Sequence, residues 1–369
     1  MKLIRTPVHA ALLALCATGF ATQALADDAL DAAKKKIDVA TMTQEKWDGP
    51  TAGPKASAGK TIVFVAGDMK NGGIVGVSKG VEEAGKAIGW TVRIVDGQGT
   101  VSARTAALNQ ALALKPSGIV VGGFDTIEQK VAFENAAKSG IPLVGWHAGE
   151  KPGPNDKAGL YANVTTVTDD VADVAASWAV VDSGGKAGVV IFTDSQYAIA
   201  LYKARAMEAV IKKCGGCTVL SFEDSPIADS STRMPQLTTS LLQRFGDKWT
   251  HSLAINDLYF DFMGPSLTAA GKKGDGNPKA VSAGDGSEAA YQRIRTKRFQ
   301  AGTVPEPLNM QGWQIVDELN RAFAKQPWSG YVPKVHLVTA DNVGKDGGPK
   351  NLFDPDNGYR DQYSRIWGK

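Results

Sequence analysis

The sequence predicts an α/β protein made of two doubly wound parallel-sheet lobes joined by a hinge. From residue 60 onward, short β-rich apolar runs alternate with helix-length amphipathic segments, which is the pattern of parallel βαβ units. The same series of strands and helices occurs twice along the chain. The length of 369 residues also exceeds what one hydrophobic core usually serves. Two lobes of this kind leave a cleft between them.

Residues 1–26 are predicted to be a secretory signal peptide. The segment starts with two basic residues, continues with a largely apolar run over 10–21, and ends in the small-x-small cleavage pattern Ala24-Leu25-Ala26. The apolar run is too short to span a membrane. We therefore expect a mature protein that begins near Asp27 and resides in the periplasm.

The charge of the chain is close to neutral. Removal of the two basic residues of the signal lowers the formal net charge from +3 to +1. A nearly neutral protein lacks the basic surface that attracts phosphates in nucleic-acid-binding proteins. We expect no nucleic-acid partner, no cofactor and a monomeric protein.

Two cysteines, Cys214 and Cys217, remain after the signal is removed. Their Cys-Gly-Gly-Cys spacing predicts a disulfide in an oxidising compartment. Redox-active pairs of this spacing lie at helix N-termini, where the dipole lowers the pKa of the thiol. This pair follows a predicted helix over residues 199–213, so a structural disulfide is favoured.

Residues 27–59 are predicted to form an N-terminal arm on the surface, with a short helix around 29–37. The Gly/Pro-rich stretch 48–54 cannot form regular structure. The first lobe is expected over residues 60–165. Its predicted elements are strand 61–66, helix 73–88, strand 91–96, helix 102–114, strand 118–121, helix 126–139 and strand 142–145.

The second lobe is expected over residues 166–302. Its predicted elements are helix 169–181, strand 186–192, helix 199–213, strand 218–222, helix 233–245, strand 252–255, helix 259–270, strand 280–283 and helix 287–301. Residues 303–369 then form a crossover and C-terminal segment with a strand near 303, a helix over 310–323 and a strand over 335–338. Late segments of this kind are expected to complete the first lobe.

Candidate ligand-binding residues follow the predicted strands, because ligands of open parallel sheets bind beyond the carboxyl ends of the strands. The candidates are Asp68, Asn71, Asp125, Trp146, His147, Asp194, Tyr197, Asn256, Asp285 and Glu306. Carboxylates and carboxamides bridge neighbouring hydroxyl groups, and aromatic rings cover apolar faces. This set favours a sugar or polyol as ligand. Any single Asp at such a junction can instead cap the following helix.

Several stretches resemble those of a known family. They are Thr-Ile-Val-Phe-Val at 61–65, Gly-Ile-Pro-Leu-Val at 140–144, Ala-Ile-Asn-Asp at 254–257, Gly-Asp-Gly at 284–286 and Pro-Glu-Pro at 305–307. In this order and spacing, over about residues 60–340, the chain resembles the ribose/galactose branch of type I periplasmic binding proteins. These are the substrate-binding components of ABC sugar importers. The resemblance implies the type I fold, hinge closure on a small ligand, no catalysis, and an ABC transporter permease as partner.

The resemblance also implies roles for four residues. Asn71 and Asn256 match carboxamides of the family's cleft, and Asp285 matches the carboxylate that holds sugar hydroxyls. Glu306 falls where the family often has a late polar group. The structural alternative is a turn residue for Asn256, and a turn or cap for Asp285.

Other positions depart from the family pattern. Gly72-Gly73 replaces aromatic residues, and His147-Ala148 stands where an Asp-Arg pair is expected. Tyr197 and Tyr202 stand where an arginine is expected. These departures leave room for a bulkier or less hydroxylated ligand, with Trp146 and Tyr197 as aromatic walls.

Rival hypotheses remain open from sequence. Carboxylates in a cleft are compatible with an exported hydrolase, the same fold serves ligand-presenting sensors of chemoreceptors or kinases, and the ligand can be an aromatic or nucleoside-like solute.

A nucleophile-elbow pattern at 76–80 lies inside a predicted helix and is not at a strand-to-helix turn. The histidines at 147, 251 and 336 are too dispersed to predict a metal site. The basic run 293–298 is either a solvated face or a surface that docks to the transporter.

Overall fold

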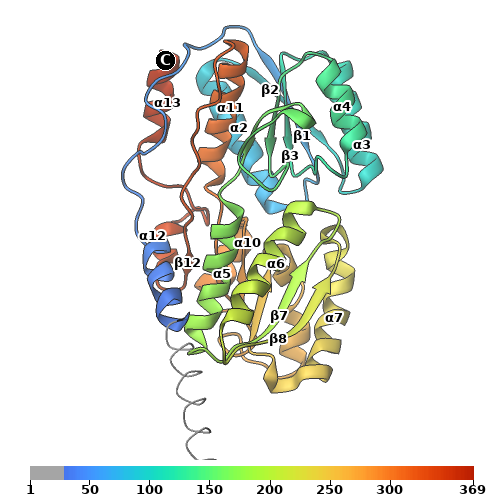
Figure 1. Cartoon of the computed structure of the whole chain (residues 1–369), viewed down its shortest axis with the longest axis vertical. Coiled ribbons are helices and arrows are strands. Elements are labelled where there is room, and N and C mark those ends of the chain that lie inside the picture. The colour runs from blue at the N-terminus through green and yellow to red at the C-terminus, as the bar shows by residue number, and fades with distance from the viewer. Residues whose placement is uncertain (1–28) are drawn as a thin grey trace, which may run out of the picture.

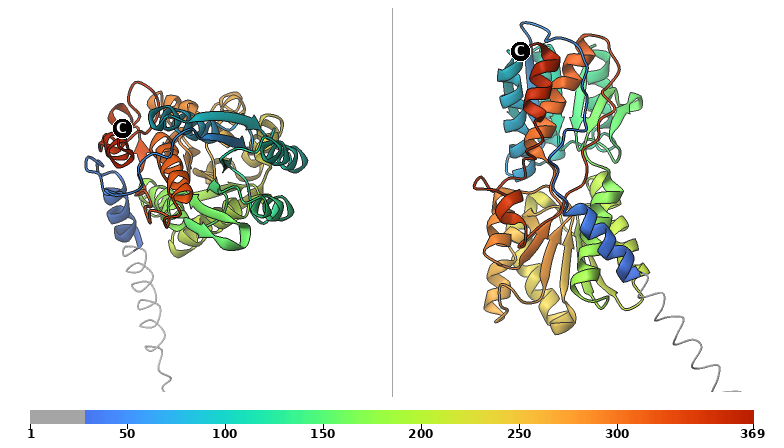
Figure 2. Two further views of the ribbon diagram at one scale, coloured as in Figure 1. Left: turned by 90° about the horizontal axis from the view of Figure 1, so that it is seen from above. Right: turned by 90° about the vertical axis from the view of Figure 1, so that its left-hand side faces the viewer.

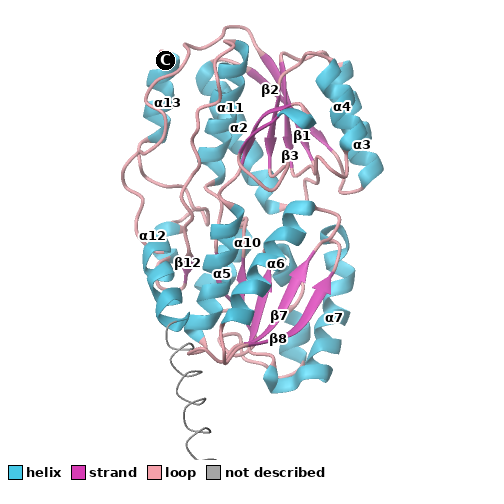
Figure 3. Ribbon diagram, viewed as in Figure 1, coloured by secondary structure: helices cyan, strands magenta, loops and turns pink. Residues whose placement is uncertain are grey.

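The structure, a computed structural model, describes residues 29–369 and consists of two lobes stacked along its long axis (Figure 1). The predicted signal peptide lies outside these residues. In each lobe, helices flank a central sheet of six strands (Figure 3). No helix in the described part of the chain is long and apolar enough to cross a membrane. The predicted α/β fold of two lobes is confirmed.

The first sheet has the strand order β2-β1-β3-β4-β6-β5. Its strands are β1 (Thr61–Ala66), β2 (Thr91–Asp96), β3 (Gly118–Gly122), β4 (Leu143–Trp146), β5 (Gly153–Asn155) and β6 (Leu160–Val164). All pairs are parallel except β5 with β6. The connecting helices are α2 (Gly72–Ile88), α3 (Val101–Ala113) and α4 (Lys130–Lys138). The predicted apolar face of α2 is buried, and Gly89 ends the helix with φ 87°.

The second sheet has the order β12-β11-β10-β9-β7-β8. Its strands are β7 (Gly188–Thr193), β8 (Thr218–Asp224), β9 (His251–Ala254), β10 (Lys279–Ser282), β11 (Gln300–Thr303) and β12 (Val338–Thr339), of which β12 is antiparallel to β11. Its helices are α5 (Thr168–Asp182), α6 (Ala198–Lys213), α7 (Ser230–Phe245), α8 (Leu258–Asp261), α9 (Gly264–Ala269), α10 (Glu288–Arg295) and α12 (Val343–Asp346). The parallel strands of both sheets therefore offer carboxyl ends at which ligands bind.

Late segments return to the first lobe. The helices α11 (Leu308–Phe323) and α13 (Tyr359–Trp367) contribute Leu319 and Tyr363 to the core that also contains Phe64. Between them the chain visits the second lobe to form β12 and α12 (Figure 2). Several chain segments thus connect the lobes. The predicted domain limits at residues 60, 166 and 303 stay predictions.

The N-terminal arm contacts both lobes. Residues 29–40 are helical, and Ala33 and Ala40 pack into the core of the second lobe. The arm then runs along the first lobe, where the backbone N–H of Ser57 donates to Asn320 Oδ1 at 2.9 Å. The Trp47 ring lies 5.1 Å from that of Tyr331. The arm is therefore a packed strap and does not project into solvent.

Some predicted boundaries are wrong. The helix predicted over 287–301 ends at Arg295, because Lys297 and Phe299 adopt positive φ, and β11 begins at Gln300. The helix predicted over 126–139 begins only at Lys130, since the Asp125 side chain accepts bonds from two backbone N–H groups of the preceding turn.

Other elements differ as well. The helix predicted over 259–270 is divided into α8 and α9, with Pro265 at the start of the second piece. The strands β5 and β6 and the helix α13 were not predicted. Part of the basic run 293–298 is engaged within the protein: Arg293 forms an ion pair with Asp261, and Arg295 donates to the carbonyl oxygen of Gly348 at 2.9 Å.

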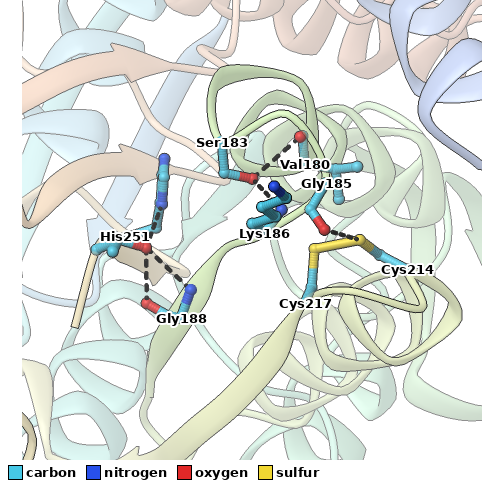
Figure 4. The surroundings of a disulfide bond; sticks show 9 residues. Val180, Ser183, Gly185, Lys186, Gly188, Cys214, Cys217 and His251 are labelled. Atoms are coloured by element: carbon cyan, nitrogen blue, oxygen red, sulfur yellow. Dashed lines mark hydrogen bonds between the residues drawn. A yellow bond between two sulfur atoms is a disulfide. The ribbon is translucent and has the colours of Figure 1, made fainter. Parts of the chain in front are cut away.

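Cys214 and Cys217 form the predicted disulfide, with their Cα atoms 5.3 Å apart. Cys214 caps the C-terminal end of α6, as expected for a structural bond. Its sulfur lies 3.4 Å from the carbonyl oxygen of Gly185 in the turn after α5 (Figure 4). The disulfide ties the end of α6 to Cys217, the residue directly before β8.

We predict that replacing both Cys214 and Cys217 by serine lowers the free energy of unfolding by about 2 kcal/mol or less, because the bond closes a very short loop in the unfolded chain. Urea unfolding of the double variant measures this loss. Ligand affinity should be unchanged, since the bond lies at the C-terminal end of α6, opposite the carboxyl ends of the strands. A loss of binding with retained fold would contradict a purely structural role.

Candidate functional site

A small cavity of about 70 Å³ lies between the two lobes. The residues that line it are Asp68, Asn71, Ile74, Gly99, Gly123, Trp146, His147, Tyr197, Ile199, Ala200, Lys203, Ile227, Ala228, Ile255, Asn256 and Asp285. Most of them follow strands of the two sheets or begin the helices after them. The carboxyl ends of both sheets therefore face one space between the lobes, as the sequence predicts.

The loop after β1 approaches the second lobe closely. Asn71 caps α2, since its Oδ1 accepts the backbone N–H of Gly73 at 2.9 Å. A Cβ atom at Gly73 would lie only 2.4 Å from Cβ of Asp285, and one at Gly72 would lie 2.8 Å from Cβ of Ser287. Side chains at these two positions would separate the lobes. This contact explains why glycines replace the aromatic residues that the family often has here.

A histidine occupies the centre of the site. The ring of His147 stacks on the indole of Trp146, with centroids 4.0 Å apart and planes at 9°. Its Nε2 lies 3.1 Å from Oε1 of Glu306, and its Nδ1 lies 3.7 Å from Oδ1 of Asp285. The Trp146 N–H donates to Gln311 Oε1 at 2.7 Å. His147 thus joins the first lobe, the crossover segment and the second lobe.

The two carboxyl groups beside His147 are shifted in opposite directions. Burial would raise the pKa of Glu306, but the hydrogen bond and charge of His147, the Thr166 hydroxyl and the charge of Lys203 lower it to about 2. Burial raises the pKa of Asp285, and the charges of His147 and Lys203 offset only part of this effect. Glu306 is therefore held ionised, while Asp285 takes up a proton more readily than an ordinary aspartate.

On the second lobe, Asn256 Nδ2 donates to Asp285 Oδ2 at 2.6 Å, while its Oδ1 accepts the backbone N–H of Leu258. The ammonium of Lys203 donates to the carbonyl oxygen of Ala283 at 2.6 Å. The N-cap of α10 is Ser287, so Asp285 is not needed as a helix cap. Its carboxylate instead faces the cavity beside an amide and a cation.

Beside the cavity, the lobes are joined by a second group of bonds. Arg104, fully buried on α3, donates to the Tyr197 hydroxyl of the second lobe at 2.6 Å and to both carboxylate oxygens of Glu128. Asp125 Oδ2 accepts the backbone N–H of Ala198, at the start of α6, at 2.6 Å. We call these four side chains with Ala198 the interlobe latch. The bonds to Tyr197 and Ala198 require closed lobes.

Seven of the ten predicted residues line the cavity: Asp68, Asn71, Trp146, His147, Tyr197, Asn256 and Asp285. Glu306 lies beneath His147, and Asp125 belongs to the latch. Asp194 accepts the backbone N–H groups of Gln196 and Ile227, so it fixes local turns. A ligand-binding role for each of the ten residues stays a prediction.

Sequence reasoning missed Lys203 and Arg104. Both lie on the buried sides of their helices, α6 and α3, among apolar neighbours. A basic residue in the apolar stripe of a helix is seldom buried without a partner. Its position in the stripe is the signal that would have found both residues.

Comparison with known proteins identifies the family. A protein-family model described as a periplasmic binding protein domain matches residues 62–327, more than half of the sequence. The chain belongs to the periplasmic binding protein family, which confirms the resemblance seen in the sequence. No match was found among curated protein sequences.

Solved structures share the fold. An ABC transporter solute-binding protein from Agrobacterium vitis, bound with α-D-tagatopyranose, is 16% identical, with 80% of this chain and 99% of that chain covered and a TM-score of 0.71. A glucose-galactose binding protein from Geobacillus stearothermophilus is 17% identical, with 78% and 99% covered and a TM-score of 0.68. Another solute-binding protein from Agrobacterium vitis, with bound allitol, is 19% identical, with 78% and 97% covered and a TM-score of 0.66.

We predict that Glu306→Gln lowers the free energy of unfolding at pH 7 by on the order of 3 kcal/mol, because the ionised carboxylate is stabilised by the fold. This contribution is present above the ordinary pKa of 4.5 and is lost as the pH falls toward about 2. Urea unfolding at several pH values should therefore show the variant and the wild type converging in acid.

The matched control is Glu134→Gln on the surface of α4, where the side chain is 46% exposed and its ion pair is long at 3.9 Å. It should unfold like the wild type. An equal loss of stability for Glu306→Gln at pH 7 and pH 3 would show that packing, and not charge, sets its effect.

Proposed function

We propose that the protein is the substrate-binding component of an ABC importer, which captures a small hydroxyl-bearing solute, a sugar or polyol, between its lobes. The observation that supports this most directly is the cavity between the lobes, which is lined by Asn71 and His147 of one lobe and by Asn256 and Asp285 of the other. Two of the similar solved structures hold α-D-tagatopyranose and allitol. Its partner is the transporter permease, and its compartment is the periplasm.

Hinge closure follows from where the contacts lie. Periplasmic binding proteins, the family to which the chain belongs, close their two lobes around a ligand by a hinge motion. Opening the lobes would separate Arg104 from Tyr197, Asp125 from Ala198 and His147 from Asp285. A ligand that bridges the lobes adds its bonds to these and favours the closed form.

We further propose that the protein returns its ligand chemically unchanged. Neither serine, threonine nor cysteine is among the described residues that line the cavity, so no nucleophile of those types faces His147 there. The histidine is held between Glu306 and Asp285, and it stacks on Trp146. This arrangement favours binding over hydrolysis.

We predict that Asp285→Asn weakens binding roughly tenfold to a hundredfold, since a hydrogen bond to a charged acceptor contributes about 1.5 to 3 kcal/mol. Isothermal titration with D-galactose, D-tagatose, allitol and glycerol measures dissociation constants for both proteins. The exposed Asp275→Asn is the control and should bind as the wild type does. Equal affinities for wild type and Asp285→Asn would contradict the site.

We predict that Tyr197→Phe shifts the protein toward open lobes and weakens binding about tenfold or more. The Arg104–Tyr197 bond exists only when the lobes are closed, so its loss destabilises the closed form and leaves the open form unchanged. Small-angle X-ray scattering should give a larger radius of gyration for this variant.

The matched control is Tyr202→Phe, which removes the hydrogen bond that the Tyr202 hydroxyl donates to Asp169 within the second lobe. It should leave the radius of gyration unchanged. If both variants scatter alike, the Arg104–Tyr197 bond does not hold the lobes together.

A further inference from the structure

Lys203 of α6 is a buried lysine that lines the cavity between the lobes. The residue is 5% exposed, and its neighbours on the buried side of α6 are apolar, among them Ile199, Ala200 and Met207. An ammonium group removed from water is costly unless hydrogen bonds or an opposite charge replace the water. An apolar side chain would serve the packing of α6 equally well. The ammonium therefore calls for an explanation other than packing.

The protein satisfies only part of this ammonium. Nζ of Lys203 donates to the carbonyl oxygen of Ala283 at 2.6 Å, which is the one hydrogen bond that the described part of the chain provides for it. An ammonium has three N–H groups. No carboxylate oxygen of the described residues lies within 4.0 Å of this nitrogen. Two N–H groups therefore remain for water or a ligand in the cavity.

The carboxylate of Asp285 is close to this ammonium without forming an ion pair with it. A Cβ atom at Gly284 would lie 3.2 Å from Lys203 Nζ, so the ammonium adjoins the residue directly before Asp285. Burial raises the pKa of Asp285, and the charges of His147 and Lys203 offset part of this effect. Both the ammonium and the carboxylate belong to residues that line the cavity. Opposite charges thus face the same space from the second lobe.

One oxygen of Asp285 remains able to accept a hydrogen bond. Its Oδ2 accepts from Asn256 Nδ2 at 2.6 Å. Its Oδ1 lies 3.7 Å from His147 Nδ1, which is too long for a hydrogen bond. The lining of the second lobe therefore offers an ammonium donor and a carboxylate acceptor side by side.

A donor and an acceptor in this arrangement suit a hydroxyl group. A hydroxyl accepts a hydrogen bond from an ammonium and donates its own proton to a carboxylate. A ligand carboxylate would be attracted to Lys203 but repelled by Asp285, and a ligand ammonium would be attracted to Asp285 but repelled by Lys203. The first lobe adds the carboxylate of Asp68 to the lining, which is a second source of repulsion for an anionic ligand. A neutral group therefore fits this place best.

We propose that Lys203 is a ligand-binding residue and that, together with Asp285, it selects a neutral hydroxyl group over charged groups. The ligand hydroxyl accepts from the Lys203 ammonium and donates to Asp285 Oδ1. Uronic acids and amino sugars are therefore poorer ligands than the neutral sugars from which they derive. This inference rests on the proposed capture of a sugar or polyol between the lobes. It adds a contact residue and a selection by charge.

Lys203→Met tests the contact, because methionine fills a similar space without the charge. Isothermal titration with D-galactose, D-tagatose and allitol should show a loss of affinity of roughly tenfold to a hundredfold for each compound that the wild type binds. Without ligand, the melting temperature should be equal to that of the wild type or higher, since a buried charge with one partner has been removed. A lysine that only held Ala283 in place would give a lower melting temperature and an unchanged affinity.

D-galacturonate and protonated D-galactosamine test the selection by charge, each compared with D-galactose. Both should bind the wild type at least about tenfold more weakly than galactose. In Lys203→Met the disadvantage of galactosamine should shrink, because the like charge is gone. The disadvantage of galacturonate should grow, because an attraction is lost while the carboxylates remain.

The control variant is Lys213→Met, at the exposed last residue of the same helix. It should bind and melt as the wild type does. Unchanged affinities in Lys203→Met, or equal binding of galactose and its two charged analogues, would overturn the inference and leave the proposed function intact. A wild-type protein that binds none of the neutral compounds would instead contradict the proposed function, and the inference would fall with it.

Discussion

The site depends on one buried charge, the carboxylate of Glu306, at the point where the chain leaves the second sheet and enters α11. An ionised carboxylate without water is costly unless several donors surround it. Its donors come from three separate parts of the chain: His147 after β4, Thr166 at the first crossover, and Gln311 on α11. The requirement to satisfy Glu306 therefore fixes the crossover segments relative to one another and aims His147 at the second lobe.

The contacts between the lobes divide into two groups with different consequences. The interlobe latch is formed by protein groups alone, so it sets how favourable closure is before any ligand arrives. The cavity groups, above all Asp285 and Lys203, add their bonds to the ligand once one is bound. Because apparent affinity depends on both, a protein of this design can tune affinity at Arg104 or Asp125 without changing its preference among ligands. Specificity then resides in the wall of the cavity.

Much of the fold could be predicted from sequence because parallel strands are short β-rich apolar runs, and the segments 61–66 and 91–96 match β1 and β2 to the residue. The strands β5 and β6 were not predicted, because the segment around them is rich in glycine, proline and charged residues. The basic run after Arg295 has the composition of a helix, yet tertiary contacts turn the chain into β11.

Seven predicted residues line one cavity because they were selected at the carboxyl ends of strands. Those ends can be located from the order of strands and helices along the chain. The partnership of His147 with Glu306 spans 159 residues and has no local signature. The isoleucines among the lining residues were missed for a similar reason. An isoleucine that lines a cavity has the same sequence pattern as one in the core.

The packed arm has a consequence for the order in which the molecule can be completed. Its residues are made early, yet the carbonyl oxygen of Pro54 accepts a bond from Asn320, 266 residues later, and the backbone N–H of Ala56 donates to the carbonyl oxygen of Trp367, two residues before Lys369. Contacts so distant in sequence form late, since most of the chain must be present before they can close. The contacts of the arm with the C-terminal segment therefore form late in folding. A chain that ended before these last residues would have a first lobe without these contacts.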